Sequence, residues 1–355
     1  MKYTEREVFA IWLDSFEKIE YKRKSELFSL YGGESIARFV AKYAERIDFL
    51  LGKRASLLFG AANGEYTEYI LSSLHKKGVI AVTQNSEAYP EELFEVPCPP
   101  LVIYARGNAS LLKSEKFAVV GSRKSSAFAV AKTEEFTEKL IEAGFTIVTG
   151  FAEGADIAAV KAALASGKII AVLAGGFDHI YPKAHAAIFE KVVLNGLAIS
   201  EYPPSVPTAA FHFPVRNRII AGLGKGLLVM SGGKKSGTLY TAGYADGLSK
   251  QIFALPYGIN ELSGAGCNEL IRRGAYLTEC AEDVLEYYGK EIKTQTSALS
   301  EAEREVLSLL KEGAIHIDKL CARLNKRAFE LLPVLSMLEI KKLIVRGAGN
   351  VYEAL

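Results

Sequence analysis

The 355-residue chain is long enough for two or three domains, and its 49% apolar and 24% charged residues are typical of a globular protein. Because the formal net charge of the chain is only +2, a polyanionic partner would have to bind to a local cluster of cations. The four cysteines form no Cys-x-x-Cys pair, which argues against a structural zinc site. We find neither an apolar signal core near the amino terminus nor an apolar stretch long enough to span a bilayer. We therefore expect a cytoplasmic protein with no membrane partner.

Residues 1–78 have the apolar periodicity of short helices, with clusters such as Phe9, Trp12 and Phe16 separated by charged residues. We predict a small helical, SAM-like domain here, which serves either as a packing module or as a surface for nucleic acid or a partner. Two strand-like stretches follow, at 79–82 and 101–104, joined by a proline-rich loop. They form either an edge of the main sheet or a small sheet beside it.

From residue 117 onward, short apolar runs alternate regularly with helical segments. This alternation predicts a Rossmann-like, mostly parallel sheet with helices on both faces, within a domain spanning 79–288. Ligands of such sheets bind beyond the carboxyl ends of the strands. The predicted strands are 117–120, 146–149, 169–173, 197–199, 227–230 and 252–255, and the predicted helices are 126–143, 154–166, 184–195, 214–223, 237–249 and 265–273.

The last part of the chain shows a different pattern. A polar linker at 289–297 precedes Ser300, which with Glu303 makes a helix-capping box. Helices at 300–311, 316–323 and 327–339, followed by strands at 343–345 and 351–352, predict a winged-helix domain over 298–355. Winged helices bind either DNA or proteins, and this pattern leaves both open.

The stretch 117–126 carries the first functional signal. A buried strand ends at Gly121, and Ser125 and Ser126 are typical N-cap residues for the helix that follows. Strand, tight turn and helix amino terminus together present free backbone N–H groups, which favour an anion. The turn adds a hydroxyl and two cations, and we predict that it binds phosphate. The residues are Gly121, Ser122, Arg123 and Lys124.

Other loops at the same edge of the predicted sheet repeat this chemistry. Together they predict a basic groove for a chain of phosphates. Nearby aromatic side chains either offer faces on which unpaired bases can stack or pack in the core. The predicted partner is single-stranded DNA. The additional groove residues are Gly150, Gly154, Arg216, Asn217, Arg218, Lys234, Lys235, Ser236 and Gly237, and the aromatic residues are Phe177, Tyr181, Phe211 and Phe213.

Signals for catalysis are weak. The sequence contains no Gly-x-Ser-x-Gly nucleophile elbow and no His-Glu-x-x-His metal motif. Residues 232–238 resemble a phosphate-binding Walker loop, but Gly237 is followed by Thr238 and Leu239 instead of Lys-Ser or Lys-Thr. We therefore expect no cofactor, no metal and no enzymatic activity. We expect the carboxylates of Asp156, Asp178 and Glu201 to orient loops by accepting backbone N–H groups.

A set of motifs in this order resembles the DNA-processing protein A family, also called Smf. The resemblance implies a Rossmann-like domain that binds single-stranded DNA without sequence preference. It also implies a homodimer that loads the recombinase RecA onto incoming DNA during natural transformation, without catalysis. The motifs are Gly121-Ser122-Arg123, Gly150-x-Ala152-x-Gly154-x-Asp156, Phe177-Asp178-x-x-Tyr181-Pro182, Ser200-Glu201-Tyr202-Pro203-Pro204, Phe213-Pro214-x-Arg216-Asn217-Arg218 and Lys235-Ser236-Gly237-Thr238.

The resemblance also assigns roles to individual positions. It implies that Ser122, Arg123, Arg216, Asn217, Arg218, Lys235 and Ser236 hold phosphates. It implies that Gly121, Gly150, Gly154 and Gly237 permit close approach of the backbone. This chain departs from the family pattern at Glu153, an acid that opposes a nearby phosphate, and around 20–24, where helix-hairpin-helix glycines are missing.

Two alternatives belong to other functional classes. The sheet also resembles that of the Lonely-guy phosphoribohydrolases, but Thr241 occupies the position of their catalytic glutamate, and threonine does not serve as that acid–base group. The second alternative is a non-catalytic module that binds a recombinase or a small signalling nucleotide.

Overall fold

The computed structural model describes residues 3–290, 299–341 and 343–355. The chain divides into two compact units, Met1–Glu291 and Ile292–Leu355, which we describe separately. The amino-terminal helices and the sheet belong to the same compact unit. The domain boundaries at 78/79 and 288/289 stay predictions, and most of the predicted linker lies outside the described residues.

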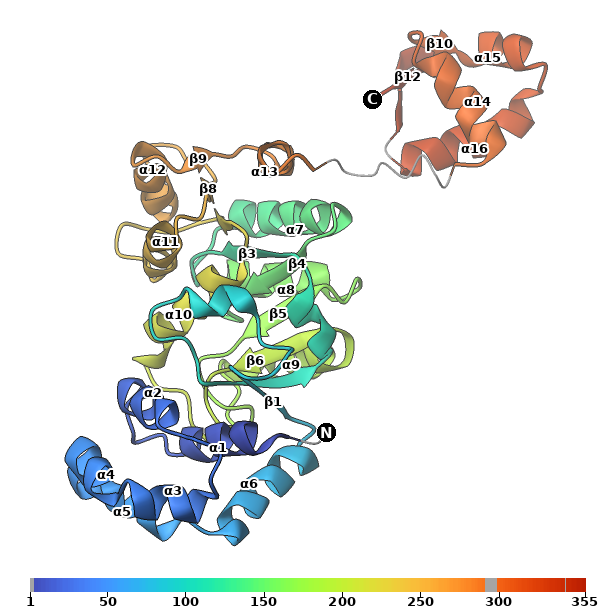
Figure 1. The fold of residues 1–355 in the computed structure, drawn as a ribbon. Coiled ribbons are helices and arrows are strands. Elements are labelled where there is room, and N and C mark those ends of the chain that lie inside the picture. Colours follow the sequence, from blue (N-terminus) through green and yellow to red (C-terminus); the bar gives the residue numbers. More distant parts are fainter. Residues whose placement is uncertain (1–2, 291–298, 342) are drawn as a thin grey trace. The chain divides into compact units, whose positions relative to one another are not determined.

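Six short helices open the first unit and form the predicted bundle (Figure 1). Three of them start at side-chain caps, Thr4, Ser35 and Asn63, which accept backbone N–H groups of the first turn. The fully buried Phe9, Trp12 and Phe39 lie at the centre of the bundle. The helices are α1 (Glu5–Asp14), α2 (Tyr21–Ser29), α3 (Ile36–Lys42), α4 (Ala44–Leu51), α5 (Ala55–Gly60) and α6 (Gly64–Lys76).

A nine-stranded sheet forms the centre of this unit, in the order β1-β2-β6-β5-β4-β3-β7-β8-β9. In this order, the strands from β6 through β3 to β9 are parallel to one another. At one edge, β2 pairs antiparallel with β6, and β1 pairs antiparallel with β2. The mostly parallel Rossmann-like sheet is confirmed, and the two early strands join its edge. The strands are β1 (Ile80–Thr83), β2 (Val102–Gly107), β3 (Lys116–Val120), β4 (Thr146–Thr149), β5 (Ile169–Val172), β6 (Leu197–Ser200), β7 (Leu227–Val229), β8 (Ile252–Ala254) and β9 (Tyr276–Leu277).

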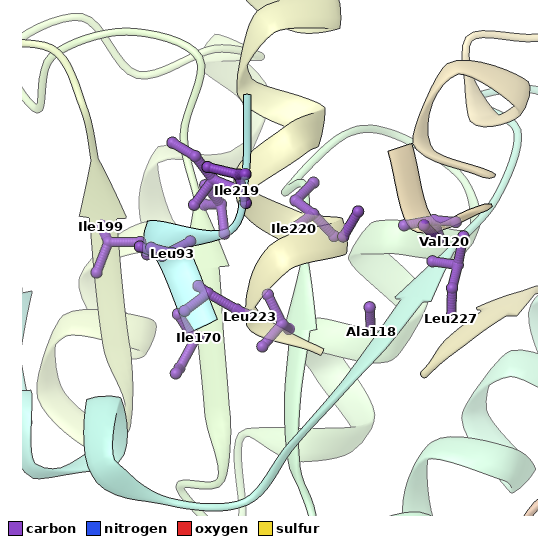
Figure 2. Close-up of a cluster of buried hydrophobic side chains, with 14 of the residues drawn as sticks. Leu93, Ala118, Val120, Ile170, Ile199, Ile219, Ile220, Leu223 and Leu227 are labelled. Atoms are coloured by element: carbon purple, nitrogen blue, oxygen red, sulfur yellow. The ribbon is translucent and has the colours of Figure 1, made fainter. Parts of the chain in front are cut away.

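Helices cover both faces of this sheet. Figure 2 shows Ile219 and Ile220 of α10 packed into one core cluster with Ala118 and Val120 of β3. Phe117, which points to the opposite face of β3, packs against Phe145 beside α7. The helices are α7 (Ala127–Glu142), α8 (Ala155–Ala163), α9 (Ala186–Asn195), α10 (His212–Leu223), α11 (Thr238–Gly247), α12 (Ala265–Arg272) and α13 (Ala281–Tyr287).

The second unit is the predicted winged helix. Its three helices enclose a core that includes Leu320, Leu335 and Tyr352. Its sheet has three strands, in the order β10-β12-β11, where the sequence predicted two. The missed strand β10 is only two residues long and too short to show a period. The elements are α14 (Glu301–Leu310), β10 (Ile315–His316), α15 (Ile317–Leu324), α16 (Ala328–Ile340), β11 (Ile344–Arg346) and β12 (Val351–Ala354).

Within the described part of the chain, we find no helix that combines the length and apolarity needed to cross a bilayer.

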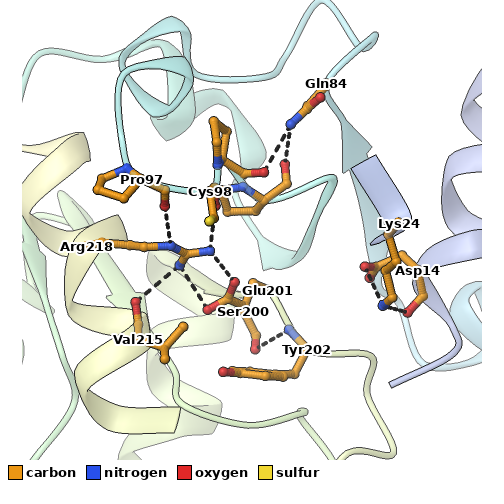
Figure 3. A network of polar contacts seen from close by, with 12 residues as sticks. Asp14, Lys24, Gln84, Pro97, Cys98, Ser200, Glu201, Tyr202, Val215 and Arg218 are labelled. Atoms are coloured by element: carbon orange, nitrogen blue, oxygen red, sulfur yellow. Dashed lines mark hydrogen bonds and ion pairs between the residues drawn. The ribbon is translucent and has the colours of Figure 1, made fainter. Parts of the chain in front are cut away.

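A buried polar contact joins the helical bundle to the sheet. Lys24 Nζ of α2 lies 3.1 Å from the Asp14 carboxylate, and both side chains are about nine-tenths buried (Figure 3). The fully buried Tyr104 of β2 donates its hydroxyl to the other oxygen of Asp14, at 3.0 Å. Because a buried ion needs a counter-charge and hydrogen bonds, this triad fixes how α1 and α2 pack on β2.

We predict that Asp14→Ala lowers the free energy of unfolding by about 3 kcal/mol, since it leaves the Lys24 ammonium buried without its counter-charge. The measurement is urea unfolding followed by the fluorescence of Trp12, the only tryptophan of the sequence. Asp48→Ala, an exposed carboxylate of α4, is the control and should change stability by less than about 0.5 kcal/mol. Equal losses in the two variants would contradict the structural role of the pair.

Candidate nucleic-acid interface

A cleft of about 400 Å³ lies beside the end of β3, where the order in which strands are added changes from one side of the sheet to the other. The strand order runs from β3 to β4 on one side and from β3 to β7 on the other, so the loops after β3 and β7 separate at this point. Open α/β sheets bind ligands at such a switch point. The cleft is lined by Gly121, Ser122, Arg123 and Lys124 after β3, by Phe213, Pro214, Arg216 and Asn217 of α10, and by Ser236, Gly237, Thr238, Tyr240 and Thr241 at the start of α11.

Serine hydroxyls join the two loops at the switch point. The Ser122 N–H donates to Ser231 Oγ at 2.9 Å, and Ser125 Oγ lies 2.8 Å from the same oxygen. Ser125 Oγ also lies 2.7 Å from the carbonyl oxygen of Ser122, and Ser126 caps α7 as predicted. The contact between Ser125 and Ser231 was not predicted, because neither position has a motif that identifies its partner across 106 residues.

Asp156 of α8 holds the base of the cleft. Its side chain is buried, and its carboxylate accepts the N–H groups of Gly121 at 3.2 Å and Ala152 at 3.4 Å. The expected role of Asp156 in orienting loops is thus confirmed. Burial raises the pKa of Asp156, although the nearby Arg216 guanidinium and the N–H donors act in the opposite direction.

Two of the predicted glycines serve loop packing. Gly154 has φ of +77°, and a Cβ there would lie 2.1 Å from the Ser122 carbonyl oxygen. A Cβ at Gly150 would lie 2.7 Å from an Asp156 oxygen and 2.8 Å from an Arg216 nitrogen. The close approach at these two positions is therefore to the protein's own loops. Gly237, in contrast, faces open space at the cleft.

Arg216 lies under the cleft rather than on its rim. It is 4% exposed and donates to the carbonyl oxygens of Gly150, at 2.7 Å, and Val172. Burial lowers its pKa to about 10, and the carboxylate of Asp156 partly offsets this effect. Arg216 therefore lines the cleft, while its Nη1 group holds the ends of β4 and β5 and its Nε donates to Asn217 Oδ1 at 3.2 Å.

Arg218 lies outside the cleft, so the prediction that it supplies a free cation there is wrong. All five of its N–H groups have acceptors in the protein: both oxygens of Glu201 and the carbonyl oxygens of Pro97, Cys98 and Val215 (Figure 3). Burial acts to lower the pKa of Arg218, but the Glu201 carboxylate raises it above its usual value.

The Arg218 network stabilises the proline-rich loop between β1 and β2. Cys98 in this loop has φ of +53°, a left-handed conformation that is costly for a residue with a side chain. The two hydrogen bonds from Arg218 to the carbonyl oxygens of Pro97 and Cys98 hold this conformation. Sequence patterns alone did not distinguish Arg216 and Arg218 from solvent-exposed cations, because their acceptors lie far away in the chain.

The exposed cations lie on the outer part of the cleft. Arg123 and Lys124 follow β3 and are exposed, and the Arg123 guanidinium lies 4.5 Å from the centre of the Phe213 ring. Across the cleft, Ser236 and Gly237 precede α11, whose amino end favours an anion. Lys234 and Lys235 are exposed on the same loop, but Lys234 lines a separate cavity of about 620 Å³ between α11 and α12.

Aromatic side chains near the cleft fall into two groups. Tyr181 and Phe211 are exposed to 51% and 70%, and Tyr181 meets Phe213 edge-on at 5.5 Å. Tyr240, on the first turn of α11, lines the cleft with 62% exposure and was missed by the sequence analysis. Phe177 is buried and packs against Phe189, so of the two alternatives for this residue core packing is confirmed and a stacking face is excluded.

The groups needed for the enzymatic alternative differ from those present. Thr241 lines the cleft and is buried at the position where the phosphoribohydrolase motif carries glutamate.

Glu153 is exposed and lines a smaller hollow next to the cleft. Arg123, Phe213 and Arg216 line both the hollow and the cleft. The described residues contain no group of three or more His, Cys, Asp or Glu side chains arranged to hold a metal ion.

Residues 80–289 match the family model described as DNA recombination-mediator protein A, and residues 291–350 match the model of the DprA winged helix domain. The chain belongs to the DNA-processing protein A (DprA/Smf) family. DprA relatives include the DNA processing protein DprA of Bacillus subtilis, 35% identical over 61% of this chain and 74% of the relative. Protein Smf of Escherichia coli is 36% identical over 74% of this chain and 73% of the relative.

Two solved DprA structures are similar to this chain. DprA from Streptococcus pneumoniae has a TM-score of 0.66 and 32% identity, covering 81% of this chain and 98% of that one. DprA from Helicobacter pylori, whose structure describes a single-stranded DNA binding mode, has a TM-score of 0.53 and 27% identity, covering 59% and 95%. The family predicted from the sequence motifs is therefore confirmed.

We predict that Arg218→Met lowers the free energy of unfolding by about 3 kcal/mol but leaves the affinity for single-stranded DNA unchanged within about twofold. The variant removes the counter-charge of the largely buried Glu201 carboxylate and leaves the cleft intact. Stability is measured by urea unfolding, and affinity by fluorescence anisotropy with a dT oligomer under conditions where the variant is folded. A tenfold loss of affinity with unchanged stability would place Arg218 at the DNA instead.

Proposed function

We propose that this DprA family member binds single-stranded DNA in the cleft at the switch point, through the sugar-phosphate backbone and without sequence preference. The observation that carries this proposal is the position of the exposed Arg123 and Lys124 opposite the amino end of α11. Cationic side chains and the amino end of a helix attract any phosphate alike, so they give affinity without reading bases. The single-stranded DNA binding mode described for the Helicobacter pylori relative supports the same ligand class.

The proposed phosphate contacts differ from the sequence prediction. Ser122, Arg123, Lys124, Asn217 and Ser236 line the cleft and are at least partly exposed. We assign to them the phosphate contacts, and to Gly237 the open backbone position at the start of α11. We assign to Lys234 and Lys235 contacts with DNA phosphates that lie just outside the cleft. Gly121, Gly150, Gly154, Asp156 and Arg216 hold the loops that carry these groups.

We propose that the bound strand is handed to the recombinase RecA during natural transformation, by a cytoplasmic homodimer. Support comes from the family model, which describes a DNA recombination-mediator protein. A cleft that contacts only the backbone leaves the bases available for a second protein, as strand transfer to a recombinase requires. No catalytic step is part of this proposal.

We propose that the cleft, rather than the winged helix, makes the main DNA contact. The third helix of a winged helix corresponds to the helix that enters the DNA groove in helix-turn-helix proteins. Here that helix, α16, contains no lysine or arginine and exposes Phe329 and Ile340. Arg323 and Lys326 just before it are paired with Glu312 and Glu305. Arg327, the N-cap residue of α16, is exposed, but α16 itself offers no cationic side chain to phosphates.

We predict that Arg123→Ala weakens binding of single-stranded DNA about tenfold, and equally for dT and mixed-sequence oligomers, because it removes one phosphate contact. The slope of log affinity against log salt should become less steep by roughly 0.7. The measurement is fluorescence anisotropy at several salt concentrations. Arg38→Ala, an exposed cation of the amino-terminal bundle, removes the same charge and should have no effect. A loss that depends on the sequence of the oligomer would contradict backbone recognition.

The two alternatives are separated by a further experiment. We predict that affinity for single-stranded oligomers falls steeply with salt and exceeds affinity for duplexes of equal length, since the phosphates of a rigid duplex are spaced differently from those of a flexible strand. An interaction module predicts no salt-dependent oligonucleotide binding. A phosphoribohydrolase predicts release of free base from nucleoside monophosphates, which chromatography detects. Either result would overturn the proposed function.

A further inference from the structure

An apolar groove runs along the amino-terminal bundle, on the first unit but apart from the DNA cleft. It consists of two adjoining hollows of about 410 and 550 Å³, which share the side chains of Tyr3 and Val8. One hollow extends toward α3 and the other toward the edge strand β1. Neither hollow contains a residue of the proposed DNA contacts.

One face of α6 forms a wall along the whole groove. Gly64, Thr67, Glu68, Leu71 and His75 all line it, and their spacing of three and four residues places them on one side of the helix. A helix of 13 residues is about 20 Å long. The groove is therefore long enough for about four turns of a second helix lying beside α6.

The groove is suited to a helix rather than to an added strand. The edge strand β1 has two N–H groups that do not pair with β2, those of Ala81 and Thr83. Tyr3 Oη accepts the first at 3.0 Å, and Ser86 Oγ accepts the second at 3.0 Å. Because both donors are already used, an extended peptide would find neither of these N–H groups free to pair with it.

The charges at one end of the groove are all of one sign. Glu5, Glu34 and Glu68 line the hollow near α3, and among the described residues that line the two hollows none is lysine or arginine. Glu34 is paired with Lys42, whereas Glu5 and Glu68 are exposed and form no ion pair with a described residue. This end of the groove favours a cation and disfavours nucleic acid.

We propose that the groove binds an amphipathic helix of a partner protein, with its apolar side chains against Tyr3, Val8 and Leu71 and its lysine or arginine side chains against Glu5 and Glu68. Helices commonly bind in this way, with an apolar face laid into a groove and charges on its rim. The bundle then provides a protein-docking surface, while the cleft of the sheet binds DNA.

The test uses the full chain and a fluorescent synthetic peptide of about four helical turns, built from leucine on one face and lysine on the other. Binding is measured by anisotropy against two peptides of equal length, one with glutamate for lysine and one with serine for leucine. We expect only the leucine–lysine peptide to bind. No binding, or equal binding of all three peptides, would overturn the proposal.

Two pairs of charge-reversal variants test whether the peptide binds in the groove. Glu5→Lys with Glu68→Lys should weaken peptide binding at least tenfold, whereas Glu45→Lys with Glu65→Lys changes the same charge at exposed positions outside the groove and should leave it unchanged. Equal losses in both pairs would show general charge attraction and contradict the groove. If the chain associates with itself and only Glu5→Lys with Glu68→Lys abolishes this association, the occupant of the groove is a second copy of the chain. This result would overturn the proposal. Binding of dT oligomers should be unchanged, which separates this test from that of the DNA cleft.

Discussion

A single enclosed carboxylate organises the surface that we assign to DNA. Asp156 accepts N–H groups from the loops after β3 and β4, and the Arg216 guanidinium lies beside it and reaches the ends of β4 and β5. A buried charge is stable only when opposite charge and hydrogen-bond donors surround it, so these loops have few alternative arrangements. The fixed loops then hold Arg123 and Lys124 outward on the rim of the cleft.

Buried and exposed cations therefore have different tasks in this protein. Arg216 and Arg218 have acceptors within the protein and determine the shape of the loops. Arg123, Lys124 and Lys235 are exposed and remain able to meet a ligand. This division explains how a chain with a net charge of only +2 offers a local surface for a polyanion. Preformed loops also reduce the conformational entropy lost when a flexible strand binds.

The sequence predicted most of the fold because its signals are local. Buried parallel strands appear as short apolar runs, and the helices α7 and α14 begin at serine caps, Ser126 and Ser300. The convergence of loops could also be predicted, since the carboxyl ends of parallel strands meet at one edge. What could not be predicted was which side chains face solvent. The inward position of Arg218 depends on Glu201 and on carbonyl oxygens about 120 residues earlier, and the burial of Phe177 depends on Phe189 of α9. The short strand β10 and the Ser125–Ser231 contact also lack a local signal.

The structure of the full chain with a dT oligomer is the most direct test of the central claim, that the switch point between β3 and β7 holds the DNA backbone. We expect consecutive phosphates within hydrogen-bond distance of Ser122, Arg123 and the amino end of α11, with Arg218 still paired to Glu201. Phosphates found on α16 of the winged helix, with the cleft empty, would contradict the account.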